Sequence, residues 1–188
     1  MNGSRTNPRA TRDMFQDYDI VYVVTDTASF LADRQWIQVF GELLMVQPDL
    51  LDQAIGKAVD FEQSYGYLML FTDGNRIDLH LETKAALVNG FIRDSLTILL
   101  LDKDNCLPVV PEPSDRDYYV NPPTAGQFMS CTNNFWWCLQ NVAKGIWRDQ
   151  LPYAKNMYHH TTRAALDKMI CWWIGLQHEY QVSVGAMN

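Results

Sequence analysis

Two aspartates, Asp17 and Asp19, stand on either side of Tyr18 at the head of an apolar run. In a β-strand, residues i and i+2 point to the same face. The two carboxylates would then lie close together, and like charges at that distance are costly without a cation between them. Mg²⁺ prefers hard oxygen ligands of this kind. The pair fits a metal site, and it fits equally two solvated side chains where a strand begins.

A third carboxylate, Asp78, belongs to the run 76–82, in which apolar residues alternate with Asp78, His80 and Glu82. This alternation is typical of a strand with one apolar and one polar face. If that strand lies near the first, Asp78 could complete a site for two metal ions. Such a site stabilises the attacking and leaving oxygens of a phosphoryl or nucleotidyl transfer. Taken alone, Asp78 would be interpreted as a surface residue.

A short turn, Gly3-Ser4-Arg5, precedes the aspartate pair. Glycine lets the backbone approach a phosphate closely, and the N–H groups of a tight turn can surround an anion. A serine hydroxyl adds a donor, and arginine adds a charged fork suited to phosphate. A Gly-Ser turn by itself indicates little, but its place ahead of the aspartates favours an anion-binding role.

Together these motifs resemble the nucleotidyltransferase superfamily that includes DNA polymerase β. Four separated stretches are similar to the aminoglycoside 6-adenylyltransferases, which modify streptomycin: NGSRTNP, FQDYDIVY, DGNRIDLHL and GIWRDQLPYAK. The resemblance runs through nearly the whole chain. It implies that Mg²⁺ and ATP bind, that a drug hydroxyl attacks the α-phosphorus, and that AMP is transferred as pyrophosphate leaves.

The resemblance also implies roles for single residues. Asp17, Asp19 and Asp78 match the family's acidic triad as metal ligands, and Asp78 is a catalytic residue that helps to deprotonate the hydroxyl. Glu82 is a second candidate for the base, or a contact for a cationic group of the drug.

On the nucleotide side, Gly3, Ser4 and Arg5 match the turn that binds the triphosphate. Lys155, near the start of a helix in the second domain, is a further candidate for reaching the triphosphate across a cleft. The alternative for Lys155 is a solvated surface lysine.

The elements that must position these residues indicate an α+β fold. The resemblance implies a nucleotidyltransferase mixed β-sheet domain that lacks its first strand, followed by an all-α helical bundle. The patterns predict strands over 20–25, 65–72, 76–82 and 96–102, and helices over 33–44 and 84–94. Asp73-Gly74-Asn75 between two of these strands is a strong hairpin signal.

Five prolines between residues 107 and 123 mark a domain boundary. We expect a nucleotidyltransferase α/β domain over 1–107, a Pro-rich linker over 108–123 and an incomplete helical domain over 124–188. Thr124 with Gln127 predicts a capping box at the start of the first helix. Pro152 suits the first turn of the next helix, and the pattern stays helical from there to about Tyr180.

Charge and composition limit the classes of function. The chain has 188 residues, and 15 Lys and Arg against 22 Asp and Glu give a net charge of −7. This balance argues against nucleic acid as a partner and suits a cationic aminoglycoside. The four cysteines match no metal or redox motif. Without a signal peptide or an apolar stretch long enough to span a membrane, we expect a cytoplasmic protein.

The resemblance implies a helix and a strand before the Gly-Ser turn, and further helices after residue 188. The chain is therefore expected to be an internal part of the family's pattern, with apolar surfaces and a strand edge left uncovered. Two alternatives follow. One is a catalytically inactive remnant that self-associates through those surfaces. The other is a related transferase with a different small-molecule acceptor, such as a lincosamide.

Overall fold

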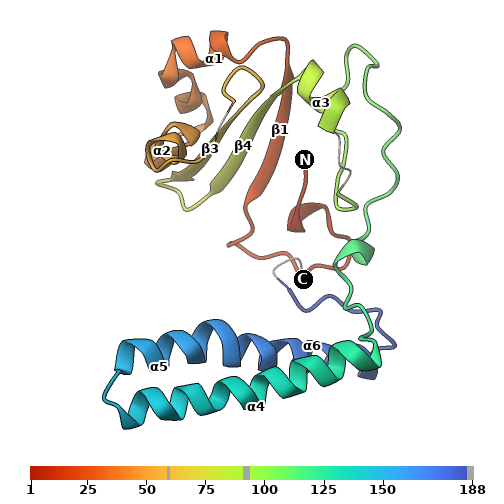
Figure 1. Cartoon of the computed structure of the whole chain (residues 1–188). Coiled ribbons are helices and arrows are strands. Elements are labelled where there is room, and N and C mark those ends of the chain that lie inside the picture. Colours follow the sequence, from red (N-terminus) through yellow and green to blue (C-terminus); the bar gives the residue numbers. More distant parts are fainter. Residues whose placement is uncertain (59, 91–93, 186–188) are drawn as a thin grey trace. The chain divides into compact units, whose positions relative to one another are not determined.

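The computed structural model describes residues 1–58, 60–90 and 94–185 (Figure 1). The chain divides into two compact units, Met1–Asp117 and Tyr118–Gly185. The division falls inside the Pro-rich stretch 108–123, whose assignment as a linker stays a prediction. The first unit contains a mixed sheet and the second is helical, so the predicted α+β class is confirmed.

The sheet has four strands in the order β1-β4-β3-β2. Their bounds are Tyr18–Val24 for β1, Leu43–Pro48 for β2, Ser64–Phe71 for β3 and Arg76–Thr83 for β4. β1 runs parallel to β4, whereas β4 with β3 and β3 with β2 are antiparallel. β1 is consequently the edge strand on the side where the Gly-Ser turn lies.

The predicted hairpin is confirmed in β3 and β4. Gly74 has φ of 87°, a conformation that glycine adopts without strain. The Asp73 carboxylate accepts a hydrogen bond of 2.9 Å from the Asn75 N–H. The Phe71 N–H donates to the Asn75 carbonyl at 2.9 Å. These local bonds fix the register of the hairpin, in which Asp78 of β4 lies opposite Leu68 of β3.

One face of the sheet forms the core of the first unit. Tyr65, Tyr67, Met69 and Leu79 are each at most 2% exposed, and Leu81 is fully buried. This face is covered by α1 (Ala28–Ala32), the 3₁₀-helix η2 (Arg34–Phe40) and α2 (Asp49–Ala54), whose apolar side chains pack against it. The opposite face is the one that Asp78, His80 and Glu82 share, because residues alternate along β4.

The helix predicted over 33–44 is correct only in its first part. The Asp33 carboxylate caps it by accepting from the Gln35 N–H at 2.9 Å, but the element is the 3₁₀-helix η2 and ends at Phe40. Gly41, with φ of 144°, turns the chain into β2, which the sequence did not predict. Pairing with β3 places Leu43 opposite Phe71, so sheet formation overrides the helical spacing of the apolar residues.

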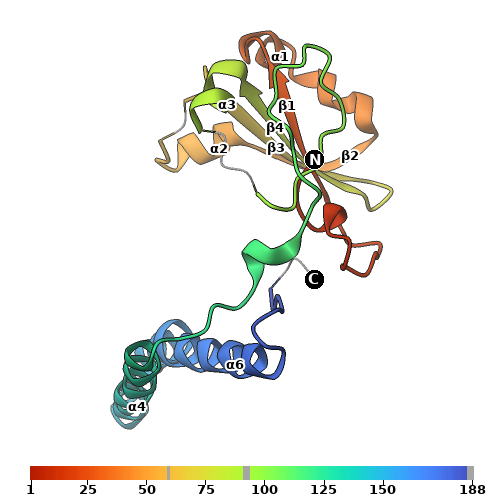
Figure 2. The same cartoon turned by 90° about the vertical axis from the view of Figure 1, so that its right-hand side faces the viewer.

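The strand predicted over 96–102 is wrong. Only Thr97 forms a bridge, and its antiparallel partner is Asn2, which also bridges Asp19 of β1. The Met1 and Ile98 backbones exchange hydrogen bonds of 3.0 and 2.9 Å. The first residues of the chain thus lie between β1 and the segment that was expected to be a strand (Figure 2).

After β4 the chain enters α3, which spans Lys84–Gly90. This agrees with the start of the helix predicted over 84–94, of which residues 91–93 lie outside the described residues. Asp94 is not helical.

The second unit consists of α4 (Ala125–Trp147), α5 (Leu151–Met157), a π-helical turn (Tyr158–Thr162) and α6 (Arg163–Gln177). The predicted capping box is confirmed. The Thr124 hydroxyl accepts from the Gln127 N–H at 3.2 Å, and the Thr124 N–H donates to the Gln127 side chain at 2.9 Å. Pro152 lies in the first turn of α5, as predicted.

Most tryptophans of the second unit are exposed. Trp172 is 9% exposed, but Trp136, Trp137, Trp147 and Trp173 are between 62% and 90% exposed. The described helices therefore leave much of their apolar surface uncovered. Within the described residues, no helix combines the length and the apolar character needed to cross a membrane.

Candidate functional site

The structure brings Asp17, Asp19 and Asp78 together at the start of β1. Asp19 and Asp78 are direct partners in the parallel register of β1 and β4, and partners in a parallel pair point to the same face. Asp17 immediately precedes β1. One carboxylate oxygen from each of the three lies within 4.8 Å of the other two. The alternation of residues along two neighbouring strands is thus enough to gather three carboxylates.

The cluster is short of positive charge. The half-buried position of Asp19 raises the pKa of its carboxyl to about 6, mainly through desolvation, with repulsion from Asp17 and Asp78 as the next causes. Arg76 acts in the opposite direction, and Asp94 adds a smaller repulsion. A carboxyl group in this situation is stabilised in its charged form by an additional cation.

Arg76 already supplies one cation to the cluster. Its Nε and terminal nitrogen donate to the two carboxylate oxygens of Asp78 at 2.8 and 2.5 Å. Its Nε also lies 3.7 Å from a carboxylate oxygen of Asp17. Hydrogen bonding to Asp78 raises the pKa of the guanidinium.

The acidic cluster fits a metal ion on two observations. Its donors are carboxylate oxygens within reach of one another, and hard oxygens of this kind suit Mg²⁺. A guanidinium stands in as the cation between two of them. The three aspartates could therefore hold a metal, as the resemblance implies.

Gly3 is packed directly against this cluster. Its φ of +77° is unfavourable for other residues, and a Cβ atom placed on it would lie 2.0 Å from the Asp19 carboxylate oxygen Oδ2. The Gly3 N–H donates to the Leu96 carbonyl at 3.1 Å, and the predicted role of Gly3 in binding a triphosphate stays a prediction. The absence of a side chain at Gly3 is what allows the turn and the carboxylate to approach.

Ser4 begins a short 3₁₀-helix, η1 (Ser4–Thr6), and its side chain is half-buried. Arg5 is held by the chain ahead of β1. It donates to the backbone carbonyls of Asp17 and Gln16 at 3.0 and 2.7 Å, and its guanidinium carbon lies 3.7 Å from the centre of the Tyr18 ring. These contacts fix the backbone immediately before β1, and the predicted contact of Arg5 with a triphosphate stays a prediction.

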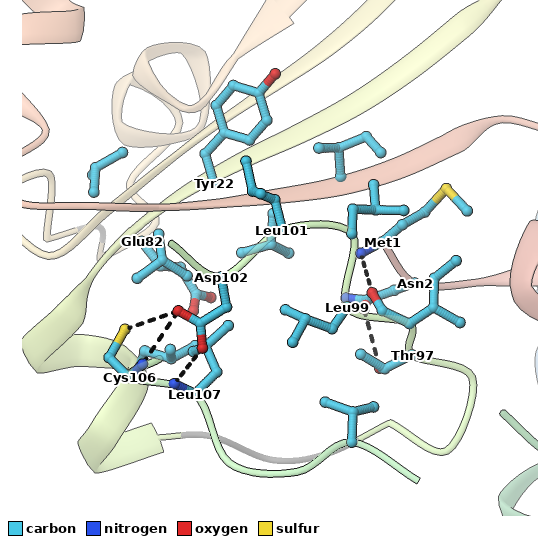
Figure 3. Close-up of a pocket in the computed structure, with 18 of the residues that line it drawn as sticks. Met1, Asn2, Tyr22, Glu82, Thr97, Leu99, Leu101, Asp102, Cys106 and Leu107 are labelled. Carbon is cyan, nitrogen blue, oxygen red and sulfur yellow. Dashed lines mark hydrogen bonds between the residues drawn. The ribbon is translucent and has the colours of Figure 1, made fainter. Parts of the chain in front are cut away.

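Glu82 lies four residues beyond Asp78 on β4, on the same face. Its carboxylate is 3.6 Å from His80 Nε2. It lines a cavity of about 510 Å³ between residues 20–24 of β1 and residues 97–107 (Figure 3). Asp17, Asp19 and Asp78 do not line this cavity. Glu82 is therefore displaced along the strand from the three aspartates.

The cavity wall opposite β1 is fixed by a turn. Asp102 accepts hydrogen bonds from the Leu107 and Cys106 N–H groups at 2.9 and 3.2 Å (Figure 3). Between this turn and Thr97, three consecutive leucines, Leu99 to Leu101, are 46% to 69% exposed. The cavity is thus largely apolar and runs beside the open edge of β1.

Lys155 lies on α5, in the second unit. Its predicted contact with a triphosphate stays a prediction.

Comparison with known proteins assigns the chain to a family. The family model for streptomycin adenylyltransferase matches residues 1–188. The chain belongs to the streptomycin adenylyltransferase family. The match covers both units, including the acidic cluster and the Gly-Ser turn.

Individual relatives agree with membership of this family. The aminoglycoside 6-adenylyltransferase of Campylobacter jejuni is 40% identical over 186 residues, which is 98% of this chain and 63% of that protein. The Bacillus subtilis enzyme of the same name is 36% identical over 193 residues, covering 98% of this chain and 65% of the relative. A crystal structure of an aminoglycoside 6-adenyltransferase from Bacillus subtilis is 32% identical, covers 92% of this chain and 63% of that chain, and has a TM-score of 0.41. The chain thus spans less than two thirds of the length of these family members.

Two contacts of the site come from residues that the sequence alone does not link to it. Asp94, which raises the pKa of Asp19, and Leu96, which accepts from Gly3, lie about 75 residues further along the chain than Asp19. No local pattern links them to the aspartates, so only the fold could reveal these contacts.

Proposed function

We propose that this chain supports the Mg²⁺-dependent transfer of AMP from ATP to a hydroxyl group of an aminoglycoside such as streptomycin, which gives antibiotic resistance. The observation that carries the proposal is the cluster of Asp17, Asp19 and Asp78, with one oxygen of each within 4.8 Å of the others. The family match over residues 1–188 supports the same reaction. ATP is the nucleotide that adenylylation requires.

Each aspartate has a proposed task. Asp17, Asp19 and Asp78 hold Mg²⁺, which when bound neutralises charge on the phosphoryl oxygens of the nucleotide. Asp78 is also proposed to accept the proton of the attacking hydroxyl. Glu82 is the second candidate for the base, and its place in the cavity beside β1 suits a contact with a cationic group of the acceptor.

The nucleotide and the acceptor are bound by residues of different character. Ser4 offers a hydroxyl to the triphosphate, and Gly3 lets the turn approach the aspartates. Arg5 is proposed to bind the triphosphate, and it also donates to the backbone carbonyls of residues 16 and 17. Lys155 is proposed as a further contact to the triphosphate. The net charge of −7 favours a polycationic acceptor over nucleic acid.

A second candidate function follows from the uncovered surfaces. The chain covers 63% to 65% of its relatives, β1 is an edge strand, and apolar side chains are exposed in both units. The strand edge and the exposed apolar side chains favour self-association. Such a chain would be a catalytically inactive remnant that self-associates through these surfaces. A related transferase with another small-molecule acceptor is the third possibility, and each of these proteins would be cytoplasmic.

One assay separates these functions. The purified chain is incubated with Mg²⁺, ATP and a panel of aminoglycosides and lincosamides, and pyrophosphate release and product mass are measured. We expect a product heavier by one AMP group with streptomycin, and none with Asp19→Asn. A product with a lincosamide alone would assign the other acceptor. A folded chain that sediments as an oligomer and forms no product with any drug would refute the transferase proposal.

A further inference from the structure

Arg76 occupies the place of a cation in the acidic cluster. Its guanidinium donates to both carboxylate oxygens of Asp78 and lies 3.7 Å from Asp17. We propose that Arg76 is a positioning residue that acts as the counter-ion of the metal-free cluster, and that it moves to the triphosphate when metal and nucleotide bind. This inference rests on the proposed function, because it takes the three aspartates to be metal ligands.

The guanidinium and a metal ion compete for the same oxygens. Both carboxylate oxygens of Asp78 are engaged by Arg76, at 2.8 and 2.5 Å. A metal that includes Asp78 among its ligands takes the lone pairs of at least one of these oxygens, so Arg76 must release that hydrogen bond. Two cations on one carboxylate also repel each other. The metal-free state is therefore stabilised by an interaction that metal binding removes.

Arg76 is able to leave without disturbing the core. Its side chain is 49% exposed, and it is the first residue of β4 after the hairpin turn. Arg5 contrasts with it, because two backbone carbonyls and the Tyr18 ring hold Arg5 in place. Of these two arginines near the aspartates, Arg76 is the one that can change partners through side-chain rotation alone.

The released guanidinium has a suitable new partner. A triphosphate held through metal at the aspartates would add anionic oxygens to the cluster that Arg76 contacts. The planar fork of arginine suits phosphate as well as it suits carboxylate. Removing Arg76 should therefore have opposite effects on two affinities: the bare metal binds more tightly, and the metal–nucleotide complex binds more weakly.

The first measurement is the affinity of the nucleotide-free chain for Mn²⁺, followed by the electron paramagnetic resonance signal of the free ion. We expect Arg76→Ala to bind Mn²⁺ about three- to fivefold more tightly, the equivalent of one exposed ion pair. Arg76→Lys keeps the charge but not the bidentate geometry, so its affinity for Mn²⁺ should lie between those of the unaltered chain and Arg76→Ala. Arg163→Ala is the matched control, because Arg163 forms a 2.6 Å bond with Asp167 in the second unit and is 52% exposed.

The second measurement uses a non-hydrolysable ATP analogue with saturating Mn²⁺. Here we expect Arg76→Ala to bind the analogue about tenfold more weakly, the value of one lost hydrogen bond between charged groups. Circular dichroism checks that each variant is folded, and Arg76→Gln replaces the alanine variant if it is not.

The outcomes distinguish this inference from the proposed function. Opposite shifts of the two affinities support the role of Arg76. Unchanged or weaker Mn²⁺ binding by the folded variant, or unchanged analogue binding, would overturn that role while leaving the metal site intact. Absence of Mn²⁺ binding by both the unaltered chain and Arg76→Ala would overturn the metal assignment and the inference together.

Discussion

Gly3→Ala tests whether the turn and the acidic cluster form one site. Gly3 has φ of 77° and ψ of −162°, a region that essentially only glycine occupies. Any other residue held there costs about 1–3 kcal/mol of stability. In addition, the new Cβ would lie 2.0 Å from Asp19 Oδ2, against the 3.0 Å below which real Cβ contacts are essentially never found, so the carboxylate must move by about 1 Å. We therefore expect lower stability together with loss of Mn²⁺ binding.

Gly74→Ala is the matched control for this substitution. Gly74 also has positive φ, at 87°, but a Cβ placed there meets nothing within 4 Å. The Gly74→Ala variant should lose stability through backbone strain alone and keep its affinity for Mn²⁺. Stability is measured by hydrogen exchange of the β1 and β4 amides, which reports on the first unit without the second. Wild-type Mn²⁺ affinity in folded Gly3→Ala would refute the reasoning, since the carboxylate could not then be constrained by the turn.

Three further predictions concern single side chains. The pKa of Asp19 is raised from 3.8 to about 6 in the folded chain, so its charged form opposes folding and stability should fall as pH rises between those values. Asp19→Asn should flatten this part of a plot of the urea midpoint against pH. An unchanged slope in that variant would contradict the prediction. Ser4→Ala should lower kcat/KM for ATP by an amount that corresponds to about 1.5–3 kcal/mol of lost transition-state stabilisation, the value of one charge-assisted hydrogen bond. Unchanged steady-state kinetics would remove Ser4 from the site. Thr124→Ala should destabilise α4 by about 1 kcal/mol through loss of the capping box, seen as earlier thermal loss of helical circular dichroism, whereas Thr132→Ala within the same helix should change it less.

The parts of the fold that could be predicted depend on local chemistry. Asp73-Gly74-Asn75 dictates a hairpin, and the alternation that follows it dictates which residues share a face with Asp78. Thr124 and Gln127 satisfy each other's backbone groups within one turn of helix. In both cases the residues that determine the structure are neighbours in the sequence, so their types and spacing are sufficient.

The parts that could not be predicted depend on distant partners. Leu43 and Leu44 continue a helical spacing, yet pairing with β3 places them in a strand. The apolar run 96–102 has the composition of a strand. Its residues 97 and 98 pair with Asn2 and Met1 instead of with a sheet strand, and Leu99 to Leu101 are left exposed. The acidic cluster was predictable because its carboxylates follow strand alternation. Its contacts with Asp94 and Leu96 were not predictable, because those residues are distant in the sequence.

The hydrogen bonds around the turn explain why the Gly-Ser turn and the Asp-x-Asp pair belong together. The Asn2 N–H donates to the Asp19 carbonyl at 2.8 Å, and Arg5 donates to the Asp17 carbonyl at 3.0 Å. These two bonds hold the turn against the same strand end that carries the carboxylates. Gly3 lies between them and is anchored on its other side to Leu96, which is fully buried. A shift of the turn must therefore move Asp17 and Asp19, so the Ser4 hydroxyl proposed to bind the triphosphate and the aspartates proposed to bind metal are positioned by one structural unit.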